Sequence, residues 1–137
     1  MGPKITVDAV AYIVLSCYLL LMPIGWVGSV LLAAAIHELG HCMAIWALGW
    51  KVYEIRIGCF GAKIETHPMP HRDELLCALS GPATGVLLCL FYRWIPRAAF
   101  CALIQTLFNL IPVYPFDGGR AVAAISGMLR ENSVAKS

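Results

Sequence analysis

From residue 9 to residue 50 the sequence carries no charged side chain except Glu38, and most of its residues are apolar. This run is about twice the roughly 20 residues that one helix needs to cross the hydrocarbon core of a bilayer. Pro23 and Gly25 mark a break inside the run, because both residue types interrupt helices. We therefore predict two membrane-spanning helices, at about residues 8–22 and 26–49.

The composition extends this prediction to the whole chain. Of the 137 residues, 60% are hydrophobic and only 13% are charged, which is far more apolar than a typical soluble domain. Two more apolar stretches predict spans at about residues 74–92 and 98–114, followed by a C-terminal helix at about 118–130. We expect an all-α polytopic membrane protein with about four transmembrane helices, folded as a single domain over residues 1–137. The net charge of +2 is too small to indicate nucleic-acid binding.

The residues between the second and third predicted spans follow a different pattern. Tyr53, Ile55 and Ile57 alternate with charged residues, and glycines interrupt the pattern near residue 60. Alternation with a period of two, broken by a glycine-containing turn, indicates a β-hairpin, here at about residues 52–66. Because two strands alone are marginally stable in water, we expect this hairpin to be membrane-associated. Its exposed edge could accept an extended substrate as an added strand, or the hairpin could be a mere connection.

Basic residues predict the orientation of the spans. The connection after the second span contains Lys51, Arg56, Lys63 and Arg72, whereas the opposite side has Arg93 and Arg97. Connections rich in lysine and arginine stay in the cytoplasm. We therefore expect a multi-pass protein of the cell membrane with both termini in the cytoplasm. Hydrophobicity continues past the first span without a polar start after a cleavage site, so we expect no cleaved signal peptide.

Three ionisable side chains, His37, Glu38 and His41, interrupt the second predicted span. On a helix the two histidines lie one turn apart on one face, so both rings can reach one metal ion, and Glu38 can reach a water beside it. The same H-E-x-x-H spacing occurs by chance in soluble helices, as part of a polar face. Inside hydrocarbon each ionisable group costs on the order of 3 kcal/mol, and a divalent cation is a shared partner for all three. The spacing therefore predicts a zinc site within the membrane.

A catalytic zinc site usually has three protein ligands, and Asp117 is the candidate for the third. Pro112 and Pro115 interrupt the chain before it, and Gly118 and Gly119 follow it. A break of this kind can carry a carboxylate inward at membrane depth. The alternative is that Asp117 caps the C-terminal helix.

Other potential metal ligands are less convincing. His67 and His71 flank two prolines in a polar connection, so we expect them in a surface loop. The six cysteines contain no C-x-x-C pair and lie mostly in apolar stretches, so we expect packing roles for Cys17, Cys42, Cys59, Cys77, Cys89 and Cys101.

The two polar segments together resemble the site-2 protease family of intramembrane zinc metalloproteases. His37-Glu38-x-x-His41 is similar to the first motif of that family, and Asn109-x-x-Pro112-x-x-Pro115-x-Asp117-Gly118 is similar to the second. Ser80-Gly81-Pro82 resembles the Gly-Pro element of its central helix, although Thr84 and Gly85 follow where many members have Asn. The resemblance covers about residues 30–130. The second motif looks most similar to the bacterial sporulation factor IV B protease branch, which processes a membrane-associated precursor of a sigma factor.

The residues and the resemblance together predict a mechanism. One Zn²⁺ per chain is held by His37, His41 and Asp117, while Glu38 takes a proton from water and later donates it to the leaving amine. The resemblance implies that Asn109 positions the substrate or stabilises the oxyanion. It also implies a membrane-embedded or membrane-associated precursor as substrate, such as a sigma factor precursor or an anti-sigma factor. The expected surroundings are the lipid bilayer and an inhibitory membrane partner, without nucleic acid.

Two other functions fit the same residues. A membrane metal transporter could use the histidines and carboxylates as a transit site, but the second half of the sequence does not repeat the first, as transporters often do. A non-catalytic scaffold could keep zinc for stability, but a closed structural site has no use for a base such as Glu38.

Overall fold

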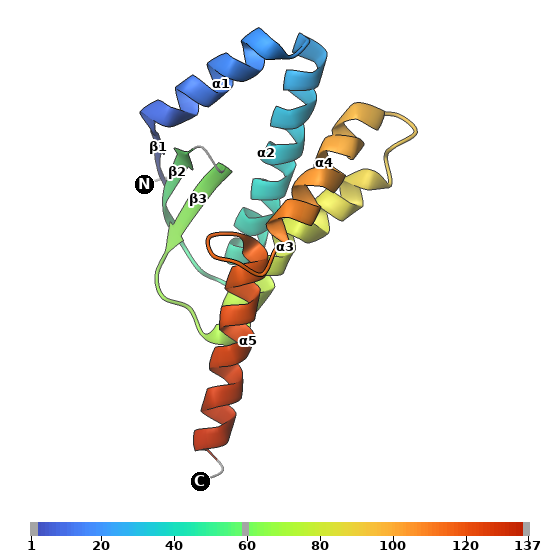
Figure 1. The fold of residues 1–137 in the computed structure, drawn as a ribbon. Helices are drawn as coiled ribbons and strands as arrows, with labels where there is room; N and C mark the ends of the chain where they lie inside the picture. The colour runs from blue at the N-terminus through green and yellow to red at the C-terminus, as the bar shows by residue number, and fades with distance from the viewer. Residues whose placement is uncertain (1–2, 59–60, 136–137) are drawn as a thin grey trace.

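A computed structural model describes residues 3–58 and 61–135 of the chain (Figure 1). Its helices are α1 (Ala9–Leu21), α2 (Ile24–Ala47), α3 (His71–Cys89), α4 (Pro96–Asn109) and α5 (Asp117–Val134). Its strands are β1 (Lys4–Val7), β2 (Val52–Gly58) and β3 (Gly61–Thr66). The chain therefore combines a helical bundle with one small sheet.

The five helices occupy the positions that the hydrophobic pattern predicts, with shifted ends. The fourth predicted span was expected to reach residue 114, but α4 ends at Asn109. The cause is local, because Pro112 and Pro115 have no backbone N–H to continue the helix. The last helix was expected at residues 118–130, whereas α5 extends from Asp117 to Val134.

Helices α2, α3 and α4 form the centre of the bundle. Their shared core is made of the buried residues Ala33, Leu88 and Ala102. Small side chains at these contacts let the helix backbones approach closely, as is common between membrane helices. Helix α5 packs along α3, whereas α1 leans away from the bundle and has no buried residue among those described (Figure 1).

The sheet differs from the expectation of an all-α fold with a two-stranded hairpin, because it has three strands. The β2 and β3 strands pair antiparallel as predicted, although residues 59 and 60 of the expected turn lie outside the described residues. A third strand, β1, pairs parallel with β2, so that the strand order is β1-β2-β3. The additional strand stabilises a ribbon that would be marginal alone. It also leaves the outer edges of β1 and β3 as the edges of the sheet.

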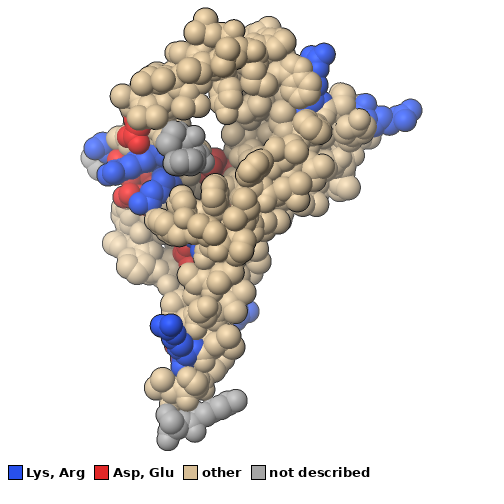
Figure 2. Space-filling view, viewed as in Figure 1, with Lys and Arg blue, Asp and Glu red and all other residues tan. Residues whose placement is uncertain are grey.

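One helix of the described part of the chain, α2, is both long and apolar enough to cross a membrane, as judged by length and composition. Helix α1 is apolar but shorter. At a rise of about 1.5 Å per residue, α4 is about 21 Å long, which is less than the roughly 30 Å of a hydrocarbon core. Charged side chains gather over the sheet in Figure 2, while the helices around it show a largely uncharged surface.

Candidate metal centre

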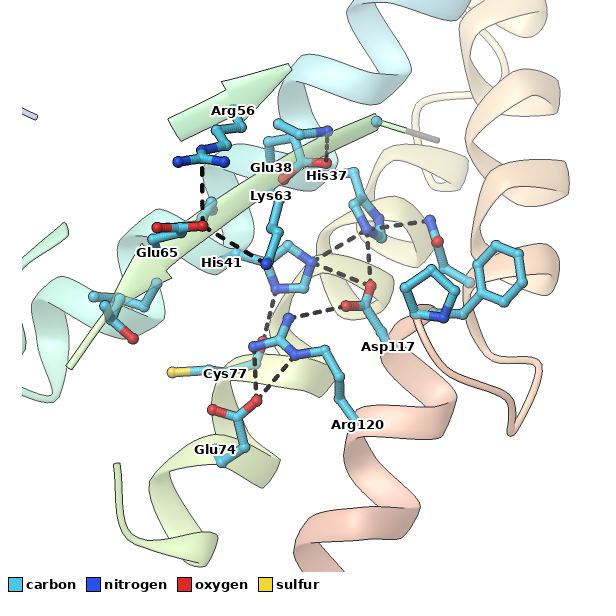
Figure 3. Close-up of a pocket in the computed structure, with 18 of the residues that line it drawn as sticks. His37, Glu38, His41, Arg56, Lys63, Glu65, Glu74, Cys77, Asp117 and Arg120 are labelled. Carbon is cyan, nitrogen blue, oxygen red and sulfur yellow. Dashed lines mark hydrogen bonds and ion pairs between the residues drawn. The ribbon is translucent and has the colours of Figure 1, made fainter. Parts of the chain in front are cut away.

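Three buried side chains from two distant parts of the chain meet at one point. The atom His37 Nε2 lies 3.0 Å from Asp117 Oδ2, and His41 Nε2 lies 3.1 Å from the same oxygen. The two Nε2 atoms are 3.2 Å apart (Figure 3). Helix α2 supplies both histidines from one face, and α5 supplies the carboxylate from its first residue. The structure thus brings together the three residues predicted as metal ligands.

This donor triangle has the size and chemistry of a zinc site. In a tetrahedral site with ligands at about 2.0–2.1 Å, the ligand atoms are separated by about 3.3 Å. The three observed separations are slightly shorter, so a small movement outward would accommodate the ion. Two imidazole nitrogens and one carboxylate oxygen form a donor set that zinc accepts. The residues present therefore fit the ion.

Close packing gives the two imidazole rings their position. His41 Nδ1–H donates a hydrogen bond to the carbonyl oxygen of Cys77 on α3, at 2.7 Å. This bond fixes the tautomer of His41 and leaves the lone pair of Nε2 facing His37 and Asp117. Gly81, also on α3, faces both rings, and a Cβ atom there would collide with them. Helix α3 thereby shapes the site without contributing one of its three ligand side chains.

Glu38 stands beside the triangle rather than within it. Its Oε1 atom accepts a hydrogen bond of 3.3 Å from the backbone N–H of Ala62 on β3. Its other oxygen, Oε2, is buried and has no hydrogen-bond partner among the described residues. A carboxylate oxygen in that state is available to a water molecule or to a substrate. The position of Glu38 therefore suits a general base better than a fourth metal ligand.

The site opens into a cavity of about 800 Å³ between the helices and the sheet. The lining combines the triangle and Glu38 with strand β3 and with the 114–117 segment. Charged side chains also line the cavity, among them Arg56, Lys63 and Glu65. Arg56 hydrogen-bonds to Glu54, which holds the pKa of that carboxyl below its ordinary value, and Thr6 adds a second hydrogen bond. The cavity is large enough for a peptide segment and polar enough for water.

Two carboxamides line the same cavity from α4. The Nδ2 atom of Asn109, predicted to contact the substrate, lies 3.3 Å from His37 Nε2. Gln105 lies one helical turn earlier and also lines the cavity. Sequence reasoning missed Gln105, although its spacing from Asn109 places both on one face of a helix.

A charged pair behind Asp117 was also missed. The Nη1 group of Arg120 lies 3.3 Å from Asp117 Oδ1, and the Nε and Nη2 groups of Arg120 each lie 2.9 Å from Glu74 Oε1. Figure 3 shows this chain of contacts running from Glu74 through Arg120 to Asp117. Arg72 and Asp73 stand beside Glu74, and Asp117 precedes Arg120, so no isolated charge in the sequence marks this pair.

The side chains expected to have no ligand role do not belong to the triangle of His37, His41 and Asp117. His71 lies 3.5 Å from Glu131, His67 stacks edge-on against Tyr53, and neither belongs to the described group of potential metal ligands. Cys17, Cys42, Cys77, Cys89 and Cys101 are free thiols. Cys59 lies outside the described residues.

Comparisons with known proteins show similarity in sequence. No family model matches the chain. The chain is 30% identical to a putative zinc metalloprotease of Synechocystis sp. over 80% of its own length. It is 28% identical to a zinc metalloprotease of Methanocaldococcus jannaschii over 68% of its own length. It is 27% identical to stage IV sporulation protein FB of Bacillus subtilis over 66% of its own length. The chain spans about a third of the length of these relatives (34%, 32% and 36%).

The fold matches a solved structure as well. The site-2 protease from Methanocaldococcus jannaschii superposes with a TM-score of 0.75 at 22% sequence identity. The match covers 93% of this chain and 69% of that protease. The arrangement of the helices and the small sheet is therefore shared.

Proposed function

Because the chain is related in sequence and in fold to the site-2 protease family of zinc metalloproteases, we propose that it is an intramembrane zinc metalloprotease. The substrate would be a membrane-embedded or membrane-associated protein precursor. The observation that carries this proposal is the position of Glu38 beside the buried triangle of His37, His41 and Asp117, at the wall of a polar cavity.

Each residue of the site has a role in this reaction. His37, His41 and Asp117 would hold one Zn²⁺, which supplies the Lewis acidity that acidifies water and polarises the scissile carbonyl. Glu38 would take the proton from the attacking water and pass it to the leaving amine. Asn109, whose amide lies beside His37, would orient the scissile peptide or donate to its developing oxyanion.

We also propose that the bundle is embedded in the cell membrane. Large apolar side chains are exposed on all four of the helices α1 to α4, including Leu20, Trp46, Leu87 and Leu107. A surface of this extent is costly in water, and contact with lipid removes the cost. The expected arrangement is four spans with both termini in the cytoplasm, with α1, α3 and α4 crossing together with α2 and the sheet at one membrane face.

The edge of β3 is the proposed docking site for an extended substrate. The outward N–H of Ala62 already contacts Glu38, so a strand added along β3 would pass next to the base. Main-chain hydrogen bonds would hold such a strand without requiring a particular sequence. A transmembrane substrate must unwind first, because a helix keeps its carbonyls in its own hydrogen bonds. Helix-breaking residues near the cleavage site should therefore favour cleavage.

The substrate class follows from the resemblance to the sporulation branch. A sigma factor precursor or an anti-sigma factor attached to the membrane is our first candidate, and one relative is named as a sporulation protein. An inhibitory membrane partner would keep such a protease silent until it is needed.

The cavity favours a protease over the two rivals. A structural zinc site closes its fourth position with a further ligand, whereas this triangle opens to a cavity of about 800 Å³ with a carboxylate at its wall. A metal transporter needs a path that continues on the other side of the site. Here the two histidines have α3 directly behind them, at Gly81.

Metal removal tests the proposed function. The purified native chain, incubated with a membrane precursor in detergent, should lose cleavage when zinc is chelated and regain it when zinc is restored. Zinc flux into vesicles that contain the protein should equal that into empty vesicles. Cleavage that persists without metal would overturn the metalloprotease assignment, and zinc flux without cleavage of any precursor would favour the transporter.

A further inference from the structure

The two oxygens of Asp117 have different partners. Oδ2 faces both histidine nitrogens, at 3.0 and 3.1 Å, whereas Oδ1 accepts a hydrogen bond from Arg120 at 3.3 Å. The side chain of Asp117 is 8% exposed, so few water molecules compete for either oxygen. One oxygen is thus directed to the candidate metal, and the other is directed away from it.

Arg120 itself has little freedom to move. Its Nε and Nη2 groups both donate to Oε1 of Glu74 at 2.9 Å, which leaves Nη1 for Asp117. The planar guanidinium fixes the direction of Nη1 once the other two groups are held. Glu74 lies in the first turn of α3, where the helix dipole favours a negative charge. Each side chain of the pair is 31% exposed, so this contact between α3 and α5 is partly buried.

The same helix orients a second ligand. Cys77 lies one turn after Glu74 on α3, and its carbonyl oxygen holds the ring of His41. Helix α3 thereby orients a ligand on α2 through Cys77 and a ligand on α5 through Glu74 and Arg120. Outer partners of this kind set the direction and the donor strength of metal ligands.

We propose that Arg120, anchored by Glu74, is a positioning residue that restricts Asp117 to binding the metal through Oδ2 alone. This inference rests on the proposed function. A carboxylate with two free oxygens can chelate a metal with both, and it would then occupy the position that water and the scissile carbonyl need. With Oδ1 held by Arg120, that position stays open.

Metal binding to purified variants tests this inference separately from proteolysis. Arg120→Gln should lower zinc affinity by about 10- to 100-fold, the range observed when an outer partner of a metal ligand is lost. Glu74→Gln should lower it by less, because Arg120 can still reach Asp117 Oδ1 and loses only its anchor. Arg120→Lys keeps the charge but cannot reach Glu74 and Asp117 with a rigid fork, so it should recover only part of the loss.

The double variant Glu74→Gln with Arg120→Gln should be no weaker than Arg120→Gln alone. Glu74 acts only through Arg120 in this account, so its effect should vanish when Arg120 is absent. If Glu74 and Arg120 contributed independently, the fold losses of zinc affinity in the two single variants would multiply in the double variant. The matched control is Arg130→Gln, which removes the same charge from an exposed position of α5 and should bind zinc as the native chain does.

Cobalt substitution reports the coordination directly. The native chain should give the intense visible absorption of four-coordinate Co²⁺, and Arg120→Gln should give the weaker absorption of a higher coordination number as Oδ1 binds. A merely structural role for Arg120 would lower the melting temperature without changing this spectrum. If Arg120→Gln does not fold, Glu74→Gln and Arg120→Lys carry the same comparison.

Two results would overturn the inference, and they are distinguishable. Zinc affinities and cobalt spectra that stay native in the Arg120 and Glu74 variants would overturn the positioning role and leave the protease proposal intact. Failure of the native chain and of Arg130→Gln to bind any metal would overturn both.

Discussion

The imidazole rings of His37 and His41 can face one another because the opposite helix presents Gly81 to them. A side chain at this position would collide with His41 Nε2 and with His37 Nε2. The Cys77 carbonyl holds His41 from the same helix, so the ring cannot turn away without losing that hydrogen bond. The proposed metal-binding geometry therefore depends on the missing side chain of Gly81 as much as on the three candidate ligands.

Gly81→Ala should lower zinc affinity sharply, because the methyl group displaces both rings. Extra volume in a packed interior lowers the free energy of unfolding by about 1–3 kcal/mol. In this variant the effect should be seen as weaker zinc binding, a lower melting temperature or both. Zinc titration and thermal unfolding measure the two effects. The control is Gly28→Ala on α2, where no atom lies within 4 Å of the added Cβ. Native zinc affinity in Gly81→Ala would contradict this account of the site.

Asp117→Asn should lower zinc affinity more than the loss of any outer partner, by over about 100-fold. The amide keeps the shape of the side chain but removes the negative charge that faces both histidines. Zinc content after purification and competition with a chromophoric chelator give the affinity. Asp73→Asn is the control, because Asp73 is a partly buried carboxylate that bonds to Trp50 away from the triangle. Full zinc occupancy in Asp117→Asn would remove this residue from the ligand set.

At the scale of single residues, the sequence predicted which three side chains meet better than it predicted the contacts that hold them in place. His37 and His41 could be paired because helical periodicity places them on one face, and Asp117 was the carboxylate in a broken helix. The contact of Arg120 with Glu74 could not be predicted, because it depends on how α3 packs on α5. The Cys77 carbonyl could not be predicted either, since every residue has one and only the fold selects it.

At the scale of elements, β3 is the strand of the sheet that contacts the candidate site. It contributes the backbone N–H that holds Glu38, and its outer edge borders the cavity. The pattern predicted β2 and β3 because their residues alternate over several positions. It missed β1 because Lys4–Val7 is four residues long and each of its residues pairs with one 50 positions later in the sequence, as Lys4 does with Glu54. Short strands with distant partners leave almost no local signal.

Ile64→Pro should reduce cleavage of an extended substrate while zinc binding stays native. Ile64 lies two residues after Ala62, so its N–H points to the same outer edge, and proline removes that donor. A proline on an edge is tolerated where the N–H does not serve the ladder. Ile64→Val, which keeps the N–H, is the control. Equal cleavage rates for Ile64→Pro and Ile64→Val would exclude strand addition at β3.

At the scale of the whole molecule, the account requires a bundle that sits in a bilayer with its sheet on the cytoplasmic side. Within the described residues, α2 is the one helix both long and apolar enough to cross a membrane, as judged by length and composition, and we propose that α1, α3 and α4 cross beside it. The sequence could give the number of apolar helices but not their tilt or depth, which packing determines.

Lys51→Cys and Arg93→Cys, each in a cysteine-free background, should react with a membrane-impermeant thiol reagent from opposite sides. Lys51 lies in the connection that we expect in the cytoplasm, and Arg93 lies in the turn between α3 and α4. Intact cells should label Arg93→Cys, and inverted vesicles should label Lys51→Cys. Labelling of both from one side would contradict the four-span arrangement.

The most direct test of the central claim compares the native chain with Glu38→Gln, each co-expressed with a panel of single-span membrane precursors, with zinc content measured on both purified proteins. The account predicts cleavage by the native chain, no cleavage by Glu38→Gln, and one zinc per chain in each, with Glu131→Gln behaving as native. Unchanged cleavage by Glu38→Gln, or absence of zinc from the native chain, would contradict it.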